Sequence, residues 1–471
     1  MPESPILVWL RRDLRLTDNP ALNAAARRGP VLPVYIHALA EEAPWAPGAA
    51  SRWWLHHSLA ALTEALAARG LPLVLRQGPS LQTLQALVRE TGARELHWNR
   101  LYEPAIIARD KTIKAALRAQ GLRVTSHQAA LLREPWELRN RQGKPYRVYT
   151  PFWREARRGL SVGDPEPLPD DCRGAEAPAS EPLQALALLP RIRWEAGLAE
   201  RWRPGEAAAL ARLRRFAARG LRGYAERREL PAEAGTSGLS PALHFGELGP
   251  RQILAELQGL PEGEDRQRFI AELGWREFAH HLLFHFPRLP DEPINERFKA
   301  FPWQPDEARL RAWQRGRTGI PLVDAGLREL WHSGWMHNRV RMVVGSLLVK
   351  NLGQPWQAGA RWFWDTLVDA DLANNSMGWQ WVAGCGADAA PFFRIFNPVR
   401  QGERFDPEGA YLRHWLPELA RLPTRWLHQP WAAPGSVLAE AGVRLGREYP
   451  EPMVDLGESR RAALEAYRRL P

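Results

Sequence analysis

The amino-terminal part of the chain, up to about residue 128, alternates short apolar runs with longer stretches of helical pattern. The apolar runs, each short enough for one strand, are Ile6–Leu10, Val31–Ile36, Leu73–Leu75, Glu95–Trp98 and Arg123–Val124. Helical patterns lie between them, near Pro20–Arg28, Ser51–Arg69, Ser80–Glu90 and Glu103–Gln120. Strands that alternate with helices of this length are joined by right-handed crossovers, which predicts a parallel, doubly wound (Rossmann-like) sheet.

The turn after the first apolar run decides whether the sheet carries a dinucleotide fingerprint. Residues 11–16 contain no glycine, so the G-x-G-x-x-G signature is absent. A ligand can still bind at the carboxyl ends of the strands, where open parallel sheets commonly hold one. The alternative, an empty scaffold, stays open at this point.

A change of composition separates this part from the rest of the chain. Residues 164–182 are rich in proline, acidic and small side chains, as in an irregular connector. From Pro204 onward the pattern is helical nearly to the end, and 471 residues suffice for two or three domains. We therefore predict an α/β domain over residues 1–130, a connector over 131–203 and an all-helical domain over 204–471.

The composition favours an acidic partner without identifying it. The formal net charge of +11 and the pI of about 10.1 suit nucleic acid. Nearly all the basic residues are arginine, however, a skew that genomic composition also produces. The two cysteines have no metal-binding spacing, and no apolar run approaches the ~20 residues that span a membrane. We expect a soluble cytoplasmic protein without a metal site.

The stretch from Trp331 to Asp406 combines tryptophans, acidic pairs, asparagines and arginines within an otherwise apolar helical region. A pure core would not hold so many polar heads, because burying one unpaired costs roughly 1–3 kcal/mol. A pure surface would not hold so many indoles. A large, flat, polar aromatic ligand buried among helices accounts for the mixture, and a flavin fits that description.

Several local patterns could bind such a ligand, although each also has a structural explanation. Gly235–Ser240 offers hydroxyl groups and backbone N–H groups at a helix start, which suits a phosphate but also caps a helix. Two triplets with i, i+3, i+4 spacing each share a helical face, where an ion pair beside a core side chain is the alternative. The triplets are Glu272, Trp275, Arg276 and Asn338, Arg341, Met342.

Two acidic residues close to a pair of asparagines form another candidate. Asp369 and Asp371 precede Asn374 and Asn375 at what resembles a polar turn entering a helix. Such carboxylates can serve acid–base chemistry, a hard cation, or hydrogen bonds to a ribose or a ring nitrogen, and ordinary capping is the structural alternative. The pattern of a calcium-binding loop is absent.

Taken together, these motifs resemble the DNA photolyase/cryptochrome family, most closely its class I cyclobutane pyrimidine dimer photolyases. The resemblance covers nearly the whole chain. The segments that carry it are Leu7–Pro20, Gly235–Ser240, Trp275–Phe278, Thr318–Ala325, Gly334–Met342, Asp369–Asn375, Gly378–Trp381 and Phe393–Pro398.

The resemblance implies that the helical domain holds FAD in a folded, U-shaped conformation, active as FADH⁻. The implied cofactor residues are Tyr224, Thr236, Ser237, Gly238, Leu239, Ser240, Arg276, Asn338, Arg341, Asp369, Ala370, Asp371 and Asn375. The implied contacts to DNA and to the flipped dimer are Arg228, Glu272, Trp275, Asn338, Arg339, Met342, Trp381 and Arg394.

A smaller set is implied to take part in the chemistry itself. Glu272 would stabilise the dimer radical anion, and Asn375 would lie at the flavin N5 position. Trp379, Trp356 and Trp303 would relay electrons between the flavin and the surface. Trp379 and Trp381 stand two positions apart, so on a helix they point in different directions.

The implied activity is light-driven electron transfer that splits the dimer without net redox change, in a monomer that needs no protein partner. Photolyases are base-flipping enzymes, and a dimer costs less to extrude because it stacks and pairs poorly. A cryptochrome-type blue-light photoreceptor on the same fold is the alternative; the intact dimer-cavity residues weigh against it. A flavin-free DNA-binding helical module is a third possibility, which a colourless purified protein would indicate.

A second, antenna chromophore is also implied by the resemblance. Folate-binding relatives carry an Asn-Glu pair after the Tyr-Glu motif, and here Tyr102 and Glu103 are followed by Pro104 without that pair. We therefore expect a deazaflavin or FMN rather than a folate, with an empty site as the alternative. The candidate lining residues are Tyr35, Ser51, Arg52 and Glu103.

Overall fold

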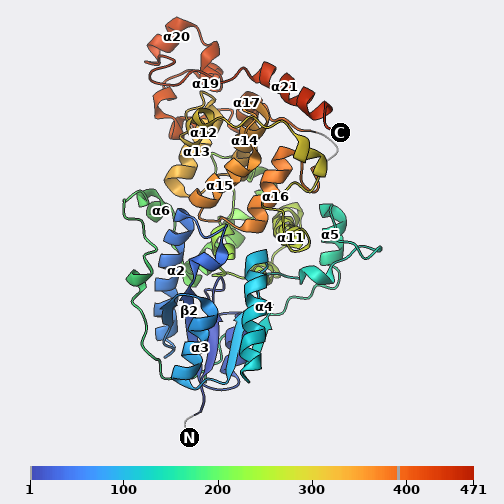
Figure 1. Ribbon diagram of the computed structural model, residues 1–471. Coiled ribbons are helices and arrows are strands. Elements are labelled where there is room, and N and C mark those ends of the chain that lie inside the picture. The colour runs from blue at the N-terminus through green and yellow to red at the C-terminus, as the bar shows by residue number, and fades with distance from the viewer. Residues whose placement is uncertain (1–2, 390–392) are drawn as a thin grey trace.

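The computed structural model describes residues 3–389 and 393–471. Its amino-terminal part, at the lower end of Figure 1, is a five-stranded sheet with helices around it. The strand order is β3-β2-β1-β4-β5, and every pairing is parallel. The strands are β1 (Ile6–Leu10), β2 (Val31–His37), β3 (Val74–Gln77), β4 (Glu95–Asn99) and β5 (Arg123–His127). The doubly wound sheet is thus confirmed, although β3 begins and ends later than the apolar run at residues 73–75.

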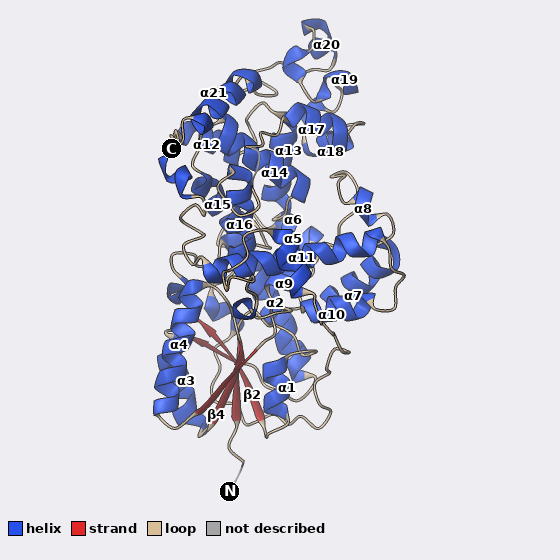
Figure 2. Cartoon of the chain, turned by 90° about the vertical axis from the view of Figure 1, so that its right-hand side faces the viewer, coloured by secondary structure: helices blue, strands red, loops and turns tan. Residues whose placement is uncertain are grey.

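Helices cover both faces of the sheet (Figure 2). They are α1 (Pro20–Ala26), α2 (Ala49–Ala67), α3 (Ser80–Thr91) and α4 (Pro104–Ala119). Successive residues of β1 point to opposite faces, so Ile6 and Val8 pack with α1 and α2, while Leu7 and Trp9 pack with α3 and α4. Burial on both faces explains why the strand is a continuous apolar run.

The connector lies along one side of this domain. The N–H of Asp18 donates to the carbonyl of Glu166, and the N–H of Val31 donates to the carbonyl of Arg173. Further along, the N–H of Glu181 donates to the carbonyl of Leu75. Backbone hydrogen bonds therefore fix residues 166–181 of the connector, which form no helix or strand. The domain limits at residues 130 and 203 stay a prediction.

The remainder of the chain is helical. The helices are α5 (Tyr149–Ala156), α6 (Ala196–Arg201), α7 (Glu206–Arg215), α8 (Tyr224–Arg227), α9 (Ser240–His244), α10 (Pro250–Leu257), α11 (Glu264–His285), α12 (Glu307–Gln314), α13 (Pro321–Ser333), α14 (Asn338–Ser346), α15 (Trp356–Thr366), α16 (Leu372–Ala383), α17 (Pro398–Phe405), α18 (Ala410–Trp415), α19 (Thr424–Leu427), α20 (Gly435–Glu440) and α21 (Leu456–Arg468). The largest core cluster gathers α13, α14, α15 and α16. No helix in the described residues is long and apolar enough to cross a membrane.

The two parts of the chain meet through buried polar contacts. Arg15, from the turn after β1, is 2% exposed and donates to the carbonyl of Gly246 at 2.9 Å. The carboxyl of Glu247 accepts from the Trp54 indole at 3.0 Å and from the N–H of Gly205 at 2.7 Å. Burial raises the pKa of Glu247 to about 7. These contacts bring the carboxyl ends of the strands against the helical part.

Candidate functional site

The loop of residues 235–240, between α8 and α9, has the geometry of an anion-binding loop. Gly238 has φ +62°, and a Cβ on Gly235 would lie 2.1 Å from the carbonyl oxygen of Arg227, so both positions favour glycine. Within the described residues, the backbone N–H groups of Ser237 and Gly238 have no hydrogen-bond partner. Backbone donors without a partner in such a loop suit a phosphate group.

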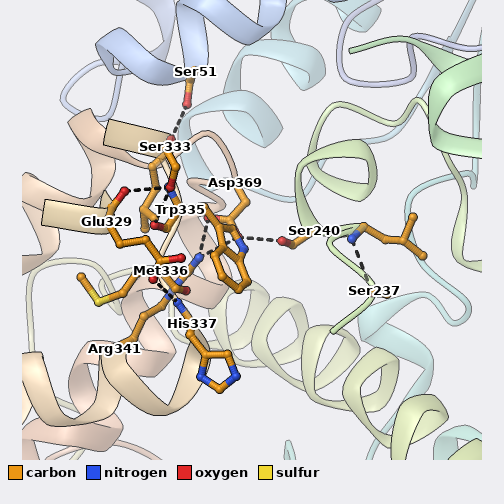
Figure 3. A network of polar contacts seen from close by, with 12 residues as sticks. Ser51, Ser237, Ser240, Glu329, Ser333, Trp335, Met336, His337, Arg341 and Asp369 are labelled. Atoms are coloured by element: carbon orange, nitrogen blue, oxygen red, sulfur yellow. Dashed lines mark hydrogen bonds and ion pairs between the residues drawn. The ribbon is translucent and has the colours of Figure 1, made fainter. Parts of the chain in front are cut away.

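Asp369 joins this loop to α14 (Figure 3). Its carboxylate accepts from the Ser240 hydroxyl at 2.7 Å and from Nη2 of Arg341 at 2.9 Å. The Nε of Arg341 also donates to the carbonyl of Met336 at 2.7 Å. Three segments that are far apart in sequence therefore meet at one carboxylate. The predicted cofactor residues of these segments lie together, with Ala370 buried beside Asp369.

Asp371 is the centre of a second polar cluster. Its carboxylate caps α16 by accepting from the N–H of Asn374 at 2.8 Å. Nε2 of His280 lies 3.4 Å and Nδ1 of His244 lies 3.7 Å from the same group. Burial by itself raises the pKa of Asp371, but the facing histidines lower that pKa well below its ordinary value. Asp371 is therefore an anion whose charge is balanced inside the protein.

The other predicted cofactor residues lie around these two clusters. The ring of Tyr224 is buried under the guanidinium of Arg228, 5.3 Å from its ring centroid. Arg276 donates to the carbonyl of Ala130 at 2.7 Å and so contacts the α/β part. The side-chain amide of Asn375 donates to the carbonyl of Ala360 at 2.9 Å, which leaves its oxygen as an acceptor.

The predicted substrate residues form ion pairs that their spacing does not suggest. Glu272 pairs with Arg228, and not with Arg276 four residues along the same helix. Arg339 pairs with Glu229. The two arginines are thus each held by a carboxylate from the segment around α8 or from α11. The i, i+4 ion pair that served as the structural alternative does not form.

The predicted tryptophans of this region pack against other rings or lie near a guanidinium. Trp275 stacks on Tyr149 with ring centroids 3.8 Å apart and an interplanar angle of 7°. Trp381 is partly exposed and lies 5.8 Å from the guanidinium of Arg394. Trp379 is buried, and its ring centroid lies 4.9 Å from that of Phe363. The two tryptophans therefore point in different directions.

Two further predicted residues lie on α14, which also carries Arg339 and Arg341. Asn338 is exposed at the first position of the helix, and Met342 is partly buried one turn later. His337, which the sequence reasoning missed, caps this helix by accepting from the N–H of Arg339 at 3.2 Å. Burial and nearby arginines lower the pKa of His337 to about 4, so its ring is neutral.

The proposed relay tryptophans differ in burial, and the relay itself stays a prediction. Trp356 and Trp379 are 1% and 4% exposed, whereas Trp303 is only partly buried. A Cβ on Gly359 would lie 2.1 Å from the Trp379 ring, so this glycine of α15 makes room for the indole. The sequence contains no pattern that would reveal such a dependence.

The residues predicted to line an antenna site have different surroundings. The hydroxyl of Ser51 donates to the carbonyl of Leu367, and Arg52 donates to the carbonyl of Pro47. Neither these two nor Tyr35 borders the cavity between the two parts of the chain, which has a volume of about 170 Å³. Glu103 does border it, and it forms an ion pair with Arg12 at 2.5 Å.

The residues present fit an FAD. The loop of residues 235–240, the carboxylates of Asp369 and Asp371 and the free amide oxygen of Asn375 offer polar groups to a ligand. Buried polar atoms also lack a partner among the described residues, including Nε1 of Trp379 and Nε2 of His337. Buried donors without a partner are costly unless a ligand satisfies them. In residues 3–389 and 393–471, no group of three or more His, Cys, Asp or Glu side chains could hold a metal ion.

A Rossmann-like domain joined to a helical domain with these clusters defines a photolyase-type flavoprotein. Residues 6–171 match the family model described as DNA photolyase, and residues 269–469 match the model described as FAD binding domain of DNA photolyase. The chain belongs to the DNA photolyase/cryptochrome family.

Individual relatives are similar along nearly the whole chain. A deoxyribodipyrimidine photo-lyase of Agrobacterium fabrum is 48% identical, with 98% of each chain covered. Cryptochrome-1 of Arabidopsis thaliana is 42% identical over 98% of this chain and 70% of its own length. A crystal structure of a bacterial class III photolyase from Agrobacterium tumefaciens has a TM-score of 0.96 at 48% identity, covering 100% of this chain and 98% of that one.

The contact between Asp371 and His280 predicts a pH-dependent stability. Burial lowers the pKa of His280, but the facing carboxylate of Asp371 raises it, and the net result is a pKa above 6.5. The stabilising contribution of protonated His280 is therefore complete below pH 6.5 and is lost as pH rises through the folded-state pKa. We expect His280→Asn to reduce the free energy of unfolding by roughly 3 kcal/mol at pH 6 and by less at pH 9. Urea unfolding at both pH values measures this difference.

The adjacent histidine provides a matched control. Burial lowers the pKa of His281 to about 3, so its ring is neutral at both pH values. His281→Asn should therefore cost the same free energy at pH 6 and at pH 9. An equal cost of His280→Asn at the two pH values would contradict a charged His280.

Replacement of Trp379 tests the electron relay. Trp379→Phe nearly conserves shape but removes the indole that is readily oxidised. We expect light-driven reduction of the bound flavin to stop largely, while repair by chemically pre-reduced protein stays near wild type. Absorption changes during illumination measure the first effect.

Trp313→Phe is the control for the relay. The ring of this buried indole lies 6.3 Å from the Trp379 ring, centroid to centroid, but Trp313 does not belong to the proposed route. It should leave photoreduction intact. Photoreduction that persists in Trp379→Phe excludes this route, and loss of both activities indicates damaged packing.

Proposed function

We propose that this protein is a light-dependent DNA repair enzyme that splits cyclobutane pyrimidine dimers. The observation that carries the proposal is that every dimer-cavity residue implied by the resemblance is present in a chain of the photolyase family. Glu272, Trp275, Met342 and Trp381 are all present, on α11, α14 and α16. These helices also carry the proposed flavin ligands, so a dimer bound among these side chains would lie beside the cofactor.

Binding of the substrate is assigned to charged and aromatic side chains. Trp275 and Trp381 supply flat faces against which a flipped dimer can pack. Arg228 and Arg339 would exchange their carboxylate partners for DNA phosphates or for the dimer itself, and Arg394 would contact a phosphate directly. These residues would increase the rate of dimer splitting by holding the dimer in a fixed position.

The bond-splitting step requires an electron, which the reduced flavin supplies when it is bound and excited by light. Glu272 would hold the carbonyl edge of the dimer where negative charge develops. Asn375 presents an amide, which carries no charge to repel an anionic ring. Arg341 and Asp369, already paired at 2.9 Å, would hold the polar edge of the ring in a fixed orientation.

The class within the family is a finer question. The motifs resemble class I enzymes, whereas the solved structure with a TM-score of 0.96 is described as class III. We propose class III on that similarity. A plant-type cryptochrome function remains the second candidate, because Cryptochrome-1 of Arabidopsis thaliana is 42% identical over nearly all of this chain. The cytoplasmic location and the monomeric state stay predictions.

We also propose that the interdomain cavity holds a flat heteroaromatic antenna. The rings of Trp45 and Trp364 border the cavity, 5.6 Å apart and nearly perpendicular, and the buried Nε1 of Trp45 has no partner among the described residues. Prolines line another wall, while Arg12, Glu103 and Asp291 add charge. An aromatic ligand with polar edges suits that combination.

Repair assays test the proposed activity. Reduced protein under blue light should convert thymine dimers in DNA to thymines and should do nothing in the dark. Glu272→Gln should lower the fraction of bound dimers split, while Kd for damaged DNA changes by less than about threefold, because its contact strengthens only as charge develops. Dimer loss by chromatography and Kd by fluorescence anisotropy measure the two quantities.

The same assay separates photolyase from photoreceptor. Unchanged dimers after illumination of protein whose flavin is spectroscopically verified as reduced would favour the photoreceptor. If Glu272→Gln weakens the affinity for damaged DNA by the same factor as it lowers repair, Glu272 contributes to ground-state binding instead.

The antenna is tested by the chromophores that denatured protein releases. After incubation with FMN, a deazaflavin or a folate, wild-type protein should release FAD and one second chromophore, and Trp45→Ala should release FAD alone. Trp331→Ala, which alters an exposed indole outside the cavity, is the control. Release of FAD alone from the wild type under all three conditions would contradict the proposal.

A further inference from the structure

Arg212 of α7 lies directly against the loop of residues 235–240, the phosphate loop. A Cβ on Gly238 would be 3.0 Å from Nη1 of Arg212 and 3.8 Å from the ring of Trp202. The guanidinium is 5.0 Å from the centroid of the Trp202 ring, so the indole supports it from one side. The absence of a side chain at position 238 thus gives the guanidinium access to the loop backbone.

Among the described residues, no acidic side chain pairs with this cation. Within the described residues, the side chain of Arg212 forms no ion pair and no hydrogen bond, whereas nearby Arg201 pairs with Glu329 at 3.0 Å. Burial, together with the like charges of Arg215 and Arg201, lowers the pKa of Arg212. A partly buried guanidinium surrounded by like charge is costly unless an anion binds to it.

The loop that Arg212 touches offers the matching anion site. The unpaired N–H groups of Ser237 and Gly238 and the cation of Arg212 belong to the same small region. Guanidinium groups bind phosphate oxygens through paired, charge-assisted hydrogen bonds, which are stronger than neutral ones. The loop and the arginine together therefore present backbone donors and a positive charge to one ligand.

We propose that Arg212 binds the diphosphate of FAD and neutralises part of its charge. The inference rests on the assignment of residues 236–240 to the cofactor phosphates, and it adds a residue from a helix outside all of the motifs that suggested the family. Because the diphosphate is remote from the reacting ring, Arg212 is a binding residue and contributes to cofactor retention. It leaves the chemistry of the ring unchanged.

The helix supplies its own control residue. Arg214 lies two positions along α7 and is exposed, so it shares the local charge and helix position without contacting the loop. Arg214→Gln and Arg212→Gln make the same change of charge. Any difference between the two variants therefore reports the location of the guanidinium rather than the net charge.

The test measures how tightly the purified holoprotein retains FAD in the dark. The fluorescence of FAD released on dilution gives Kd for wild type, Arg212→Gln, Arg212→Lys and Arg214→Gln. We expect Arg212→Gln to raise Kd about 10- to 100-fold, Arg212→Lys to restore part of the affinity, and Arg214→Gln to stay within about twofold of wild type. The visible absorption band of the bound flavin should be unchanged in every variant that is saturated with FAD.

Salt dependence and chemical protection provide independent readouts. Raised ionic strength should promote FAD release from wild type more than from Arg212→Gln. In wild-type protein, excess FAD should protect Arg212 from phenylglyoxal and leave Arg214 reactive, as peptide mass spectrometry measures. This second experiment needs no variant, so it decides the question even if Arg212→Gln fails to fold.

Three outcomes would overturn the inference. The first is a Kd for FAD in folded Arg212→Gln within twofold of wild type; the second is equal reactivity of Arg212 with and without FAD. The third is normal FAD retention with weaker, less salt-dependent DNA binding, which would make Arg212 a DNA ligand. Failure of dimer repair alone does not bear on it, because FAD retention is measured in the dark without DNA.

Discussion

The carboxylate of Asp369 holds together the segments on which the rest of the site depends. Its side chain is 5% exposed, so leaving the carboxylate without a partner would cost free energy. Ser240 and Arg341 both donate hydrogen bonds to it. These hydrogen bonds fix the phosphate loop against α14. The chain then enters α16 at Asp371, which places Asn375 and Trp379 relative to the same point.

Periodicity made much of this arrangement predictable. The five apolar runs gave the strands, and helical geometry alone separated the directions of Trp379 and Trp381. Ion-pair partners could not be predicted in the same way. Arg228 and Glu272 are 44 residues apart, and Arg339 and Glu229 are 110 apart, so only the packing of distant helices decides those pairs.

The residues predicted to line an antenna site stay a prediction, and domain packing decides which of them border a cavity. Ser51 and Arg52 lie in the first turn of α2, at an edge of the sheet domain. The helical domain covers that edge, and Gly48 approaches the backbone of Trp364 so closely that a Cβ would lie 2.3 Å from its carbonyl oxygen. Contacts of this kind depend on how two domains meet, which local sequence patterns do not encode. The cavity forms instead beside Trp45 and Glu103.

Under the proposed function, the paired arginines Arg228 and Arg339 would let a basic protein discriminate among anions. A guanidinium that is already bound to a carboxylate must give up that partner before it binds a phosphate, so casual contacts with undamaged DNA gain little from Arg228 or Arg339. Arg394 is exposed and pairs with no carboxylate among the described residues, so it is free to attract DNA from a distance. Tight binding would then require a substrate that also packs against Trp275 and Trp381. Attraction and selection are therefore assigned to different arginines.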